Sequence, residues 1–179
     1  MHSNKGKIRI IGGEHRGRRI AVPDRPGLRP TPDRVRETLF NWLGQTLDGL
    51  ACLDLFAGSG ALGFEAASRG AARVVMVEKD AEAFAALRKF KELVGMRNVE
   101  LVRGDAFAYL EREGRFDVVF LDPPFGQNAA TEALAKLPAR LAPGAHVYVE
   151  AEKPVVSEAW RELKRARAGN VSYQLLEPR

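Results

Sequence analysis

An acid followed by two prolines and an aromatic ring, Asp122 to Phe125, ends an apolar run of the sequence. The run over 118–121 is typical of a short buried strand, and the prolines prevent further strand pairing while fixing the backbone direction. Open α/β sheets bind their ligands at the carboxyl ends of their strands. The position of Asp122 therefore indicates a functional carboxylate, although an acid that caps a strand-ending turn gives the same local pattern.

A glycine-rich segment with flanking acids forms the second group of residues that could do chemistry. Asp54 precedes Gly58, Gly60 and Gly63, which follow a predicted strand and open a predicted helix with the spacing G-x-G-x-x-G. Glycines at these places allow a tight turn and a close approach of the backbone to a ligand. Glu78 lies 20 residues past Gly58, where a carboxylate that binds ribose hydroxyls is expected.

This pattern predicts a ribose-bearing cofactor and leaves its identity open. A nicotinamide dinucleotide fits the glycines, but the carboxylate of Asp54 would repel a pyrophosphate and could instead face an amino group. Asp105 follows the third predicted strand, where a second polar side chain could bind a nucleoside. The 179 residues also leave little room for a separate substrate domain, so a dehydrogenase is the least favoured class.

The elements that position these residues alternate along the chain. Apolar runs that predict strands occupy 51–55, 73–77, 99–102, 117–121 and 146–150. Helical patterns lie between them at 60–69, 81–94, 105–112 and 129–141. Such alternation predicts an α/β fold with a doubly wound, mostly parallel, Rossmann-like sheet. Residues 162–167 and 171–176 flank a Gly-Asn turn, which predicts a C-terminal antiparallel hairpin and seven strands in all.

The first residues differ from the rest of the chain. Residues 7–22 predict a small β-hairpin, and the proline-rich segment 23–30 reads as a linker. Thr31 is expected to cap the helix that follows. We therefore divide the sequence into an N-terminal hairpin arm with its linker (1–30) and a main domain (31–179).

The distribution of charge separates the same two parts. The net charge is +5, and residues 1–50 hold 10 basic and 5 acidic residues, so the whole excess lies there. A basic arm on a neutral body suggests a polyanionic partner. The single cysteine, Cys52, excludes a disulfide within the chain, and no motif predicts a metal site. The sequence has no apolar run long enough for a membrane span and no secretory leader, so we expect a cytoplasmic protein.

Several motifs together resemble one family. DLFAGSGALGFEAASRGA, the acids Glu78 and Asp105, and the tetrapeptide DPPF resemble class I S-adenosylmethionine-dependent methyltransferases that modify exocyclic amines of nucleic acids. IRIIGGEHRGRRI and LRPTPDRVRETLFNWL are similar to the RsmD family, and the motifs follow the family order over nearly the whole chain. The resemblance implies methylation of the exocyclic N2 amine of a guanine in small-subunit (16S) ribosomal RNA.

The same resemblance implies a binding site for S-adenosyl-L-methionine. Its expected residues are Asp54, Phe56, Ala57, Gly58, Ser59, Gly60, Glu78, Lys79, Asp105 and Ala106. Asp54 and the loop backbone would line the methionine end, Glu78 would accept from the ribose hydroxyls, and Asp105 would hold the adenine amine. Each acid also has a structural alternative: Asp54 could cap the loop, Glu78 could pair with Lys79, and Asp105 could cap a helix.

Within the resemblance, the acid-proline motif is the expected catalytic site. Asp122 and the backbone carbonyl of Pro123 would accept hydrogen bonds from the two N–H groups of the amine, which favours a localised lone pair. Pro124 would keep the loop rigid, and Phe125 would stack on a base flipped out of its helix. The motif does not distinguish guanine N2 from adenine N6 or cytosine N4.

The expected partner is ribosomal RNA within a small-subunit particle, without a membrane, a metal or a required oligomer. Arginines expected to bind RNA are Arg16, Arg18, Arg19, Arg29 and Arg34. The alternatives are an adenine-N6 or cytosine-N4 methyltransferase acting on RNA or DNA, and a non-catalytic RNA-binding Rossmann module.

Overall fold

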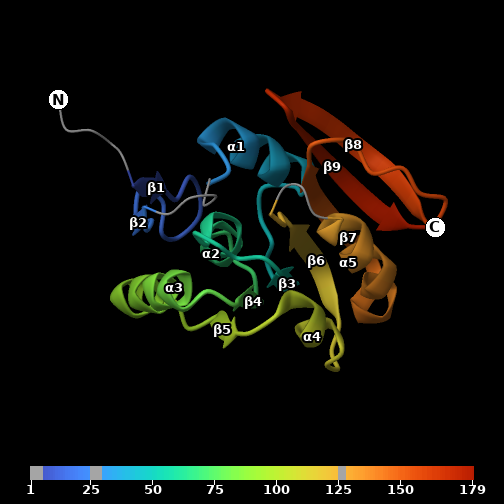
Figure 1. Ribbon diagram of the computed structural model, residues 1–179. Helices are drawn as coiled ribbons and strands as arrows, with labels where there is room; N and C mark the ends of the chain where they lie inside the picture. Colours follow the sequence, from blue (N-terminus) through green and yellow to red (C-terminus); the bar gives the residue numbers. More distant parts are fainter. Residues whose placement is uncertain (1–5, 25–29, 125–127) are drawn as a thin grey trace.

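The computed structural model describes residues 6–24, 30–124 and 128–179 (Figure 1). Arg29 and Phe125, both predicted as site residues, lie outside the described residues. The described ranges form a two-stranded sheet from the N-terminal segment and a seven-stranded sheet from the rest of the chain. This arrangement confirms the predicted α/β fold with its small N-terminal hairpin.

The large sheet has the strand order β5-β4-β3-β6-β7-β9-β8. Its strands are β3 (Ala51–Asp54), β4 (Arg73–Glu78), β5 (Val99–Arg103), β6 (Phe116–Leu121), β7 (Leu141–Ala151), β8 (Trp160–Ala168) and β9 (Val171–Pro178). The first five in sheet order are parallel, and β9 is antiparallel to both β7 and β8. Because β3 lies centrally, the chain winds outward from it in both directions, and β8 ends as an edge strand.

Helices cover both faces of this sheet. They are α1 (Asp33–Trp42), α2 (Ala61–Ser68), α3 (Ala81–Val94), α4 (Ala106–Leu110) and α5 (Ala129–Lys136). Successive strand residues point to opposite faces, so Cys52 packs in the core under α1, α2 and α3 while Leu53 packs in the core under α4 and α5. Figure 1 shows α1 and α2 beside the carboxyl ends of the central strands.

The predicted elements around residues 137–145 differ from the structure. The helix predicted over 129–141 ends at Lys136, and a short 3-10 helix (Leu137–Arg140) follows, because Pro138 has no N–H to continue the α-helical pattern. Leu141, predicted as the last residue of this helix, is instead the first residue of strand β7 and pairs with Phe116 of β6.

The predicted cap of the first helix was wrong as well. The residue at the N-cap of α1 is Pro32, and no side chain caps the helix. The hydroxyl of Thr31 instead donates a hydrogen bond of 2.7 Å to Oε1 of Glu150, 119 residues away. Thr31 therefore joins the start of α1 to the end of β7.

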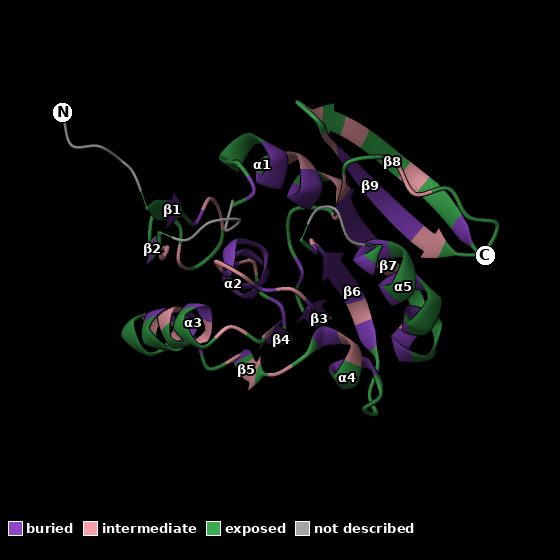
Figure 2. Cartoon of the chain, in the orientation of Figure 1, coloured by how far each residue is buried: buried purple, intermediate pink, exposed green. Residues whose placement is uncertain are grey.

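The N-terminal hairpin consists of β1 (Lys7–Arg9) and β2 (Arg19–Ala21), and the segment between them docks on α2. The backbone N–H groups of Ile11 and Gly12 each donate to the carboxylate of Glu65 at 2.9 Å, and the N–H of His15 donates to Oγ of Ser68 at 2.9 Å. Every residue of α2 is buried, as Figure 2 shows, because the helix lies between the sheet and this segment.

A buried arginine reinforces the same contact. Arg36 is completely buried, although its sequence position also allowed an exposed helix charge. Its guanidinium donates to the carbonyl of Arg9 at 2.8 Å and to Oδ1 of Asp33 at 2.5 Å, and lies 3.4 Å from Oε2 of Glu65. The division of the chain at residue 30 remains a prediction, but the two parts share a hydrogen-bonded, buried ionic core.

Candidate active site

Carboxylates follow the carboxyl ends of the five parallel strands. Asp54 and Glu78 are the last residues of β3 and β4, Asp105 and Asp122 follow β5 and β6, and Glu150 lies near the end of β7. Because these strands are neighbours and parallel, their ends meet at one edge of the sheet (Figure 1). The structure thus brings together the four acids predicted from the sequence and adds Glu150, which the sequence reading missed.

The glycine-rich loop is held at this edge by hydrogen bonds to the acids. The N–H of Gly58 donates to Oε2 of Glu78 at 2.8 Å, and the N–H of Gly63 donates to Oδ2 of Asp54 at 2.9 Å. The N–H of Ala57 donates to the carbonyl of Val77 at 2.9 Å. These bonds fix the loop against the ends of β3 and β4.

The other predicted loop residues shape the same turn. Oγ of Ser59 accepts from the N–H of Ala61 at 3.3 Å, and Phe56 packs edge-on against Phe107 with ring centroids 6.2 Å apart. Gly60 is the N-cap of α2 and has a φ of 83°, a left-handed conformation that side chains other than glycine rarely adopt. The first turn of the helix is thus tied to the loop and to β3 through the N–H groups of Ala61 and Gly63.

We expect Gly60→Ala to damage this loop. A Cβ at residue 60 would lie 2.6 Å from Cδ2 of Leu87 and from the Phe64 ring, in addition to the backbone strain. The free energy of unfolding should fall by about 2 kcal/mol or more, and cofactor affinity should fall with it. Chemical denaturation measures the first effect. Gly104→Ala is the matched control, since nothing lies within 4 Å of its Cβ position, and an equal loss in both variants would contradict the prediction.

Asp54 is a buried acid whose ionisation is costly. It is 1% exposed, and burial raises its pKa to about 7 against the opposing effect of the Gly63 N–H. The charges of Glu78 and Glu150 raise the pKa further in the same direction. The predicted alternative, a loop-capping role, is present in the structure, and the same carboxyl group would gain from a nearby cation.

Glu78 and Lys79 do not form the ion pair that was the structural alternative for Glu78. The second oxygen of Glu78 accepts from the N–H of Asp80 at 2.9 Å, and Lys79 is exposed. The half-buried carboxylate is therefore fixed by two backbone amides, one on each oxygen. Each oxygen keeps a further lone pair for a ligand hydroxyl.

Asp105 occupies the N-cap of α4. Its Oδ1 accepts from the N–H of Ala108 at 3.0 Å, which is the ordinary capping role considered as its alternative. The side chain is exposed while Ala106, the next residue, is buried. Contact of either residue with an adenine remains a prediction.

The corner after β6 contains a pair of acids in hydrogen-bond contact. Asp122 is half-buried and its carboxyl group hydrogen-bonds to Glu150, which is 5% exposed. Oε1 of Glu150 also accepts from the hydroxyl of Thr31 at 2.7 Å and from the hydroxyl of Tyr148 at 2.9 Å. Pro123 is buried and Pro124 exposed, so the corner turns from the core toward the surface.

The ionisation of this pair follows from its position. Burial, followed by the charge of Glu150, raises the pKa of Asp122 well above its ordinary value. Burial also raises the pKa of Glu150, but the hydrogen bonds it accepts oppose that effect. Asp122 is therefore the protonated member, and it donates to the Glu150 carboxylate. Two carboxyl groups in contact share one proton over a range of pH, because the charge of one disfavours ionisation of the other.

The predicted RNA-binding arginines within the described part of the chain are all exposed: Arg16 and Arg18 between the hairpin strands, Arg19 on β2 and Arg34 in the first turn of α1. Their contact with RNA remains a prediction. Across the described ranges, no group of three or more His, Cys, Asp and Glu side chains is arranged to hold a metal ion. Over the same ranges, no helix is long and apolar enough to cross a membrane.

The strand order, the glycine loop after the central strand and the acids along one edge define a Rossmann-like methyltransferase. Solved structures of low identity share this fold, including a precorrin-6y C5,15-methyltransferase from Geobacter metallireducens at 19% identity and a TM-score of 0.69. The family described as conserved hypothetical protein 95 matches residues 8–177. The chain belongs to this family, which is the RsmD family resembled by its sequence motifs.

Individual relatives match over almost their full length. Ribosomal RNA small subunit methyltransferase D of Escherichia coli K12 is 44% identical, with 98% of this chain and 92% of the relative covered. The Haemophilus influenzae protein of the same name is also 44% identical, covering 97% and 95%. The solved structure of the Escherichia coli protein yhhF is 41% identical, covers 97% of this chain and 98% of that chain, and has a TM-score of 0.87.

Proposed function

We propose that this chain transfers the methyl group of S-adenosylmethionine to the exocyclic N2 amine of a guanine in small-subunit ribosomal RNA. The observation that carries the proposal is the Asp122-Pro123-Pro124 corner, whose acid contacts Glu150 at the same sheet edge as the glycine loop. The relatives named as small-subunit ribosomal RNA methyltransferases support the substrate class. We propose that the reaction takes place in the bacterial cytoplasm, on RNA already held in a small-subunit particle.

The residues of the loop edge fit this cofactor. A buried acid with a pKa of about 7 beside the glycine loop suits a cationic ligand and disfavours a pyrophosphate. Asp54 and the backbone of 56–60 would hold the methionine end, with its amino group near the carboxyl. Glu78 would accept from the ribose hydroxyls with its remaining lone pairs, beside Lys79. Asp105 and Ala106 would face the adenine. When bound there, S-adenosylmethionine supplies a methyl group on a sulfonium, which is strongly electrophilic.

The corner can localise the lone pair of the amine. One oxygen of Asp122 and the carbonyl of Pro123 would accept hydrogen bonds from its two N–H groups, which favours a pyramidal nitrogen. The two prolines restrict the backbone, so these acceptors need little reorganisation during the reaction. Phe125, outside the described residues, would provide a stacking face for the flipped base.

The acid pair can also receive the proton that the reaction releases. As the nitrogen forms its bond to carbon it becomes cationic and strongly acidic, and an N–H proton passes to the free oxygen of Asp122. The proton that Asp122 already shared with Glu150 then moves to Glu150. The pair begins with one negative charge and ends neutral, so the proton is accounted for without forming a second buried anion.

We expect the pH dependence of methyl transfer to report this pair. Because the raised pKa of Glu150 lies above the ordinary 4.5, the pair takes up its second proton at a higher pH than a solvated carboxylate would, and activity is lost there. The single-turnover rate measured from pH 4 to 9 should show an acid limb with an apparent pKa above 4.5. A rate that stays constant down to pH 4.5 would contradict this assignment.

Glu150→Gln tests the same pair without changing its shape. The amide can still accept from Thr31 and Tyr148, but it cannot take the proton. The rate should fall by about tenfold, which is less than the usual contribution of a proton acceptor of about 100-fold or more. Affinity for S-adenosylhomocysteine should stay unchanged.

The function itself is tested with ribosomal particles from a bacterial strain that lacks this methyltransferase. The protein is incubated with those particles and labelled S-adenosylmethionine, and the labelled nucleotide is mapped by mass spectrometry. Label on one guanine N2 of the small-subunit RNA is the expected result. Label on an adenine N6 or a cytosine N4, or none in the presence of bound cofactor, would refute the proposal.

A further inference from the structure

The hydroxyl of Thr31 contacts both members of the acid pair, Asp122 and Glu150. Thr31 lies just before α1 and is 5% exposed. Its hydroxyl donates to Oε1 of Glu150 at 2.7 Å and is also in hydrogen-bond contact with the carboxyl group of Asp122. A neutral side chain from outside the large sheet is therefore placed to influence both acids.

Glu150 receives a second donor from its own strand. Tyr148, two residues earlier on β7, donates its hydroxyl to the same Oε1 at 2.9 Å. A carboxylate oxygen has two acceptor sites, so Thr31 and Tyr148 together satisfy Oε1. Donors of this kind favour the ionised form of a carboxyl group. Burial raises the pKa of Glu150, and these hydrogen bonds oppose that effect.

The titratable groups that face Glu150 from the neighbouring strands are acidic. They are Asp122 after β6, Asp54 on β3, Tyr148 on β7 and Tyr173 on β9. Burial raises the pKa of each, and the charge of Glu150 adds to that rise. Arg34 of α1 acts in the opposite direction, but on Tyr173. A negative charge on Glu150 therefore depends on the hydrogen bonds that it accepts.

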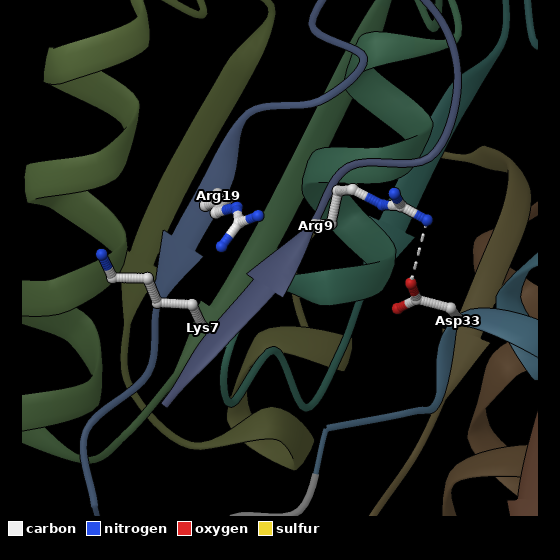
Figure 3. Close-up of a pocket in the computed structure, with 4 residues that line it drawn as sticks. All are labelled: Lys7, Arg9, Arg19 and Asp33. Atoms are coloured by element: carbon white, nitrogen blue, oxygen red, sulfur yellow. Dashed lines mark ion pairs between the residues drawn. The ribbon is translucent and has the colours of Figure 1, made fainter. Parts of the chain in front are cut away.

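The N-terminal hairpin fixes the segment that carries Thr31. Nε of Arg36 donates to the carbonyl of Thr31 at 3.2 Å, while Nη1 of the same side chain donates to the carbonyl of Arg9 on β1 at 2.8 Å. Figure 3 shows a second link, in which Asp33 pairs with the side chain of Arg9 at 3.5 Å. The other oxygen of Asp33 accepts from Arg36. The docked hairpin thus determines where the Thr31 hydroxyl lies.

We propose that Thr31 is a positioning residue for methyl transfer, whose hydroxyl holds the Glu150 carboxylate ionised and oriented to take the proton passed on by Asp122. This inference rests on the proposed function, because it assigns Thr31 to the proton transfer proposed there. Asp122 accepts a proton from the amine nitrogen and gives the proton that it held to Glu150. The Thr31 hydroxyl keeps its own proton throughout, so it acts on the reaction through Glu150.

The experiment compares variants of the full chain that differ in one hydroxyl group. Thr31→Val removes the hydroxyl and keeps the shape of the side chain, whereas Thr31→Ser keeps the hydroxyl. Thr38→Val is the matched control on α1, because the hydroxyl of Thr38 donates to a backbone carbonyl, that of Arg34, at 3.0 Å. Thr31→Ala lacks the hydroxyl in a smaller side chain and repeats the test if valine does not fit.

Two properties are measured for each variant over the same range of pH. The first is the single-turnover rate of methyl transfer to ribosomal particles. The second is the carbon-13 NMR titration of protein labelled at the glutamate carboxyl carbons, without RNA or cofactor. The Glu150 resonance is identified by its absence from the spectrum of Glu150→Gln.

Removing the Thr31 hydroxyl should raise the pKa of the pair, because a hydrogen bond donated to a carboxylate lowers its pKa. In Thr31→Val, the Glu150 titration and the acid limb of the rate should both move to higher pH by about one pH unit, the usual effect of one hydrogen bond to a charged group. On the acid side of both limbs this shift lowers the rate about tenfold, while the rate on the alkaline plateau should change less than about threefold. Thr31→Ser and Thr38→Val should follow the wild type.

Three results would overturn the proposal. The first is a wild-type carboxyl titration in Thr31→Val and Thr31→Ala. The second is an equal shift in Thr31→Ser, since that variant keeps the donor. The third is a shifted titration with an unshifted rate profile, because Thr31 would then act on the acid and not on the reaction.

The NMR titration separates this inference from the proposed function, because it requires neither RNA nor S-adenosylmethionine. A Glu150 resonance that shifts in Thr31→Val, with no transfer even by the wild type, supports the hold of Thr31 on the acid pair and refutes the function. Normal transfer by the wild type, with no shift in Thr31→Val, refutes the role of Thr31 alone.

Discussion

Replacing Asp122 with alanine is expected to lower the rate of methyl transfer at least 100-fold, about the effect of losing a positioned acid-base group and one aligned hydrogen bond. The variant removes an acceptor for the amine N–H and the only group that contacts both the amine and Glu150 in the proposed reaction. Single-turnover rates with ribosomal particles measure the effect. Affinity for S-adenosylhomocysteine should change little, because the proposed cofactor residues lie at or just after the ends of β3, β4 and β5.

Two comparison variants define the cause. Asp122→Asn keeps an acceptor oxygen and a donor to Glu150 but cannot take a proton, so its rate should lie between those of the wild type and Asp122→Ala. Glu158→Ala removes an exposed carboxylate outside the site and should have the wild-type rate. Turnover of Asp122→Ala within threefold of the wild type, with the fold intact, would exclude a direct role for this acid.

The second large effect is expected in stability, from Glu65→Ala. The carboxylate of Glu65 is completely buried and accepts from the N–H groups of Ile11 and Gly12, while pairing with Arg36 and Arg69. Its removal leaves the buried donors without their acceptor and leaves Arg36 with Asp33, at the edge of the buried site, as its acidic partner, which should cost about 3–5 kcal/mol of unfolding free energy. Burial already lowers the pKa of Arg36, which indicates how poorly that charge is solvated.

Chemical denaturation provides the measurement, and hydrogen exchange locates the damage. The amides of Ile11 and Gly12 should lose protection first, because their acceptor is gone. Glu100→Ala is the control: it removes a half-exposed ion pair with Arg73 and should cost about 1 kcal/mol or less. A loss below 1 kcal/mol for Glu65→Ala would mean that the hairpin docks by apolar packing alone.

The part of the site that the sequence predicted is the part encoded locally. Asp54, the glycine loop and Glu78 lie within one strand-loop-helix-strand unit, and their spacing alone places them together. Asp122 was identified in the same way, from the strand that it follows and the prolines behind it. The order of the sheet then brings these residues to one edge, as alternation of strands and helices indicates.

Features that depend on distant contacts could not be predicted in this way. Glu150 ends an ordinary apolar strand, and only the pairing of β6 with β7 brings it to Asp122. Thr31 has the residue type of a helix cap, but a buried acceptor on β7 takes its hydroxyl. Arg36 and Glu65 are 29 residues apart, and nothing in the spacing of either helix distinguishes a buried charge from a solvated one.

The C-terminal hairpin has a consequence for how the molecule behaves in concentrated solution. β8 lies at the border of the large sheet, where its unpaired backbone groups could template a strand from another molecule. Its sequence, WRELKRARA, places a charge at five of nine positions, and all five charged residues are exposed. A neighbouring copy would have to bury those charges to extend the sheet. The charged side chains of this edge strand therefore disfavour aggregation.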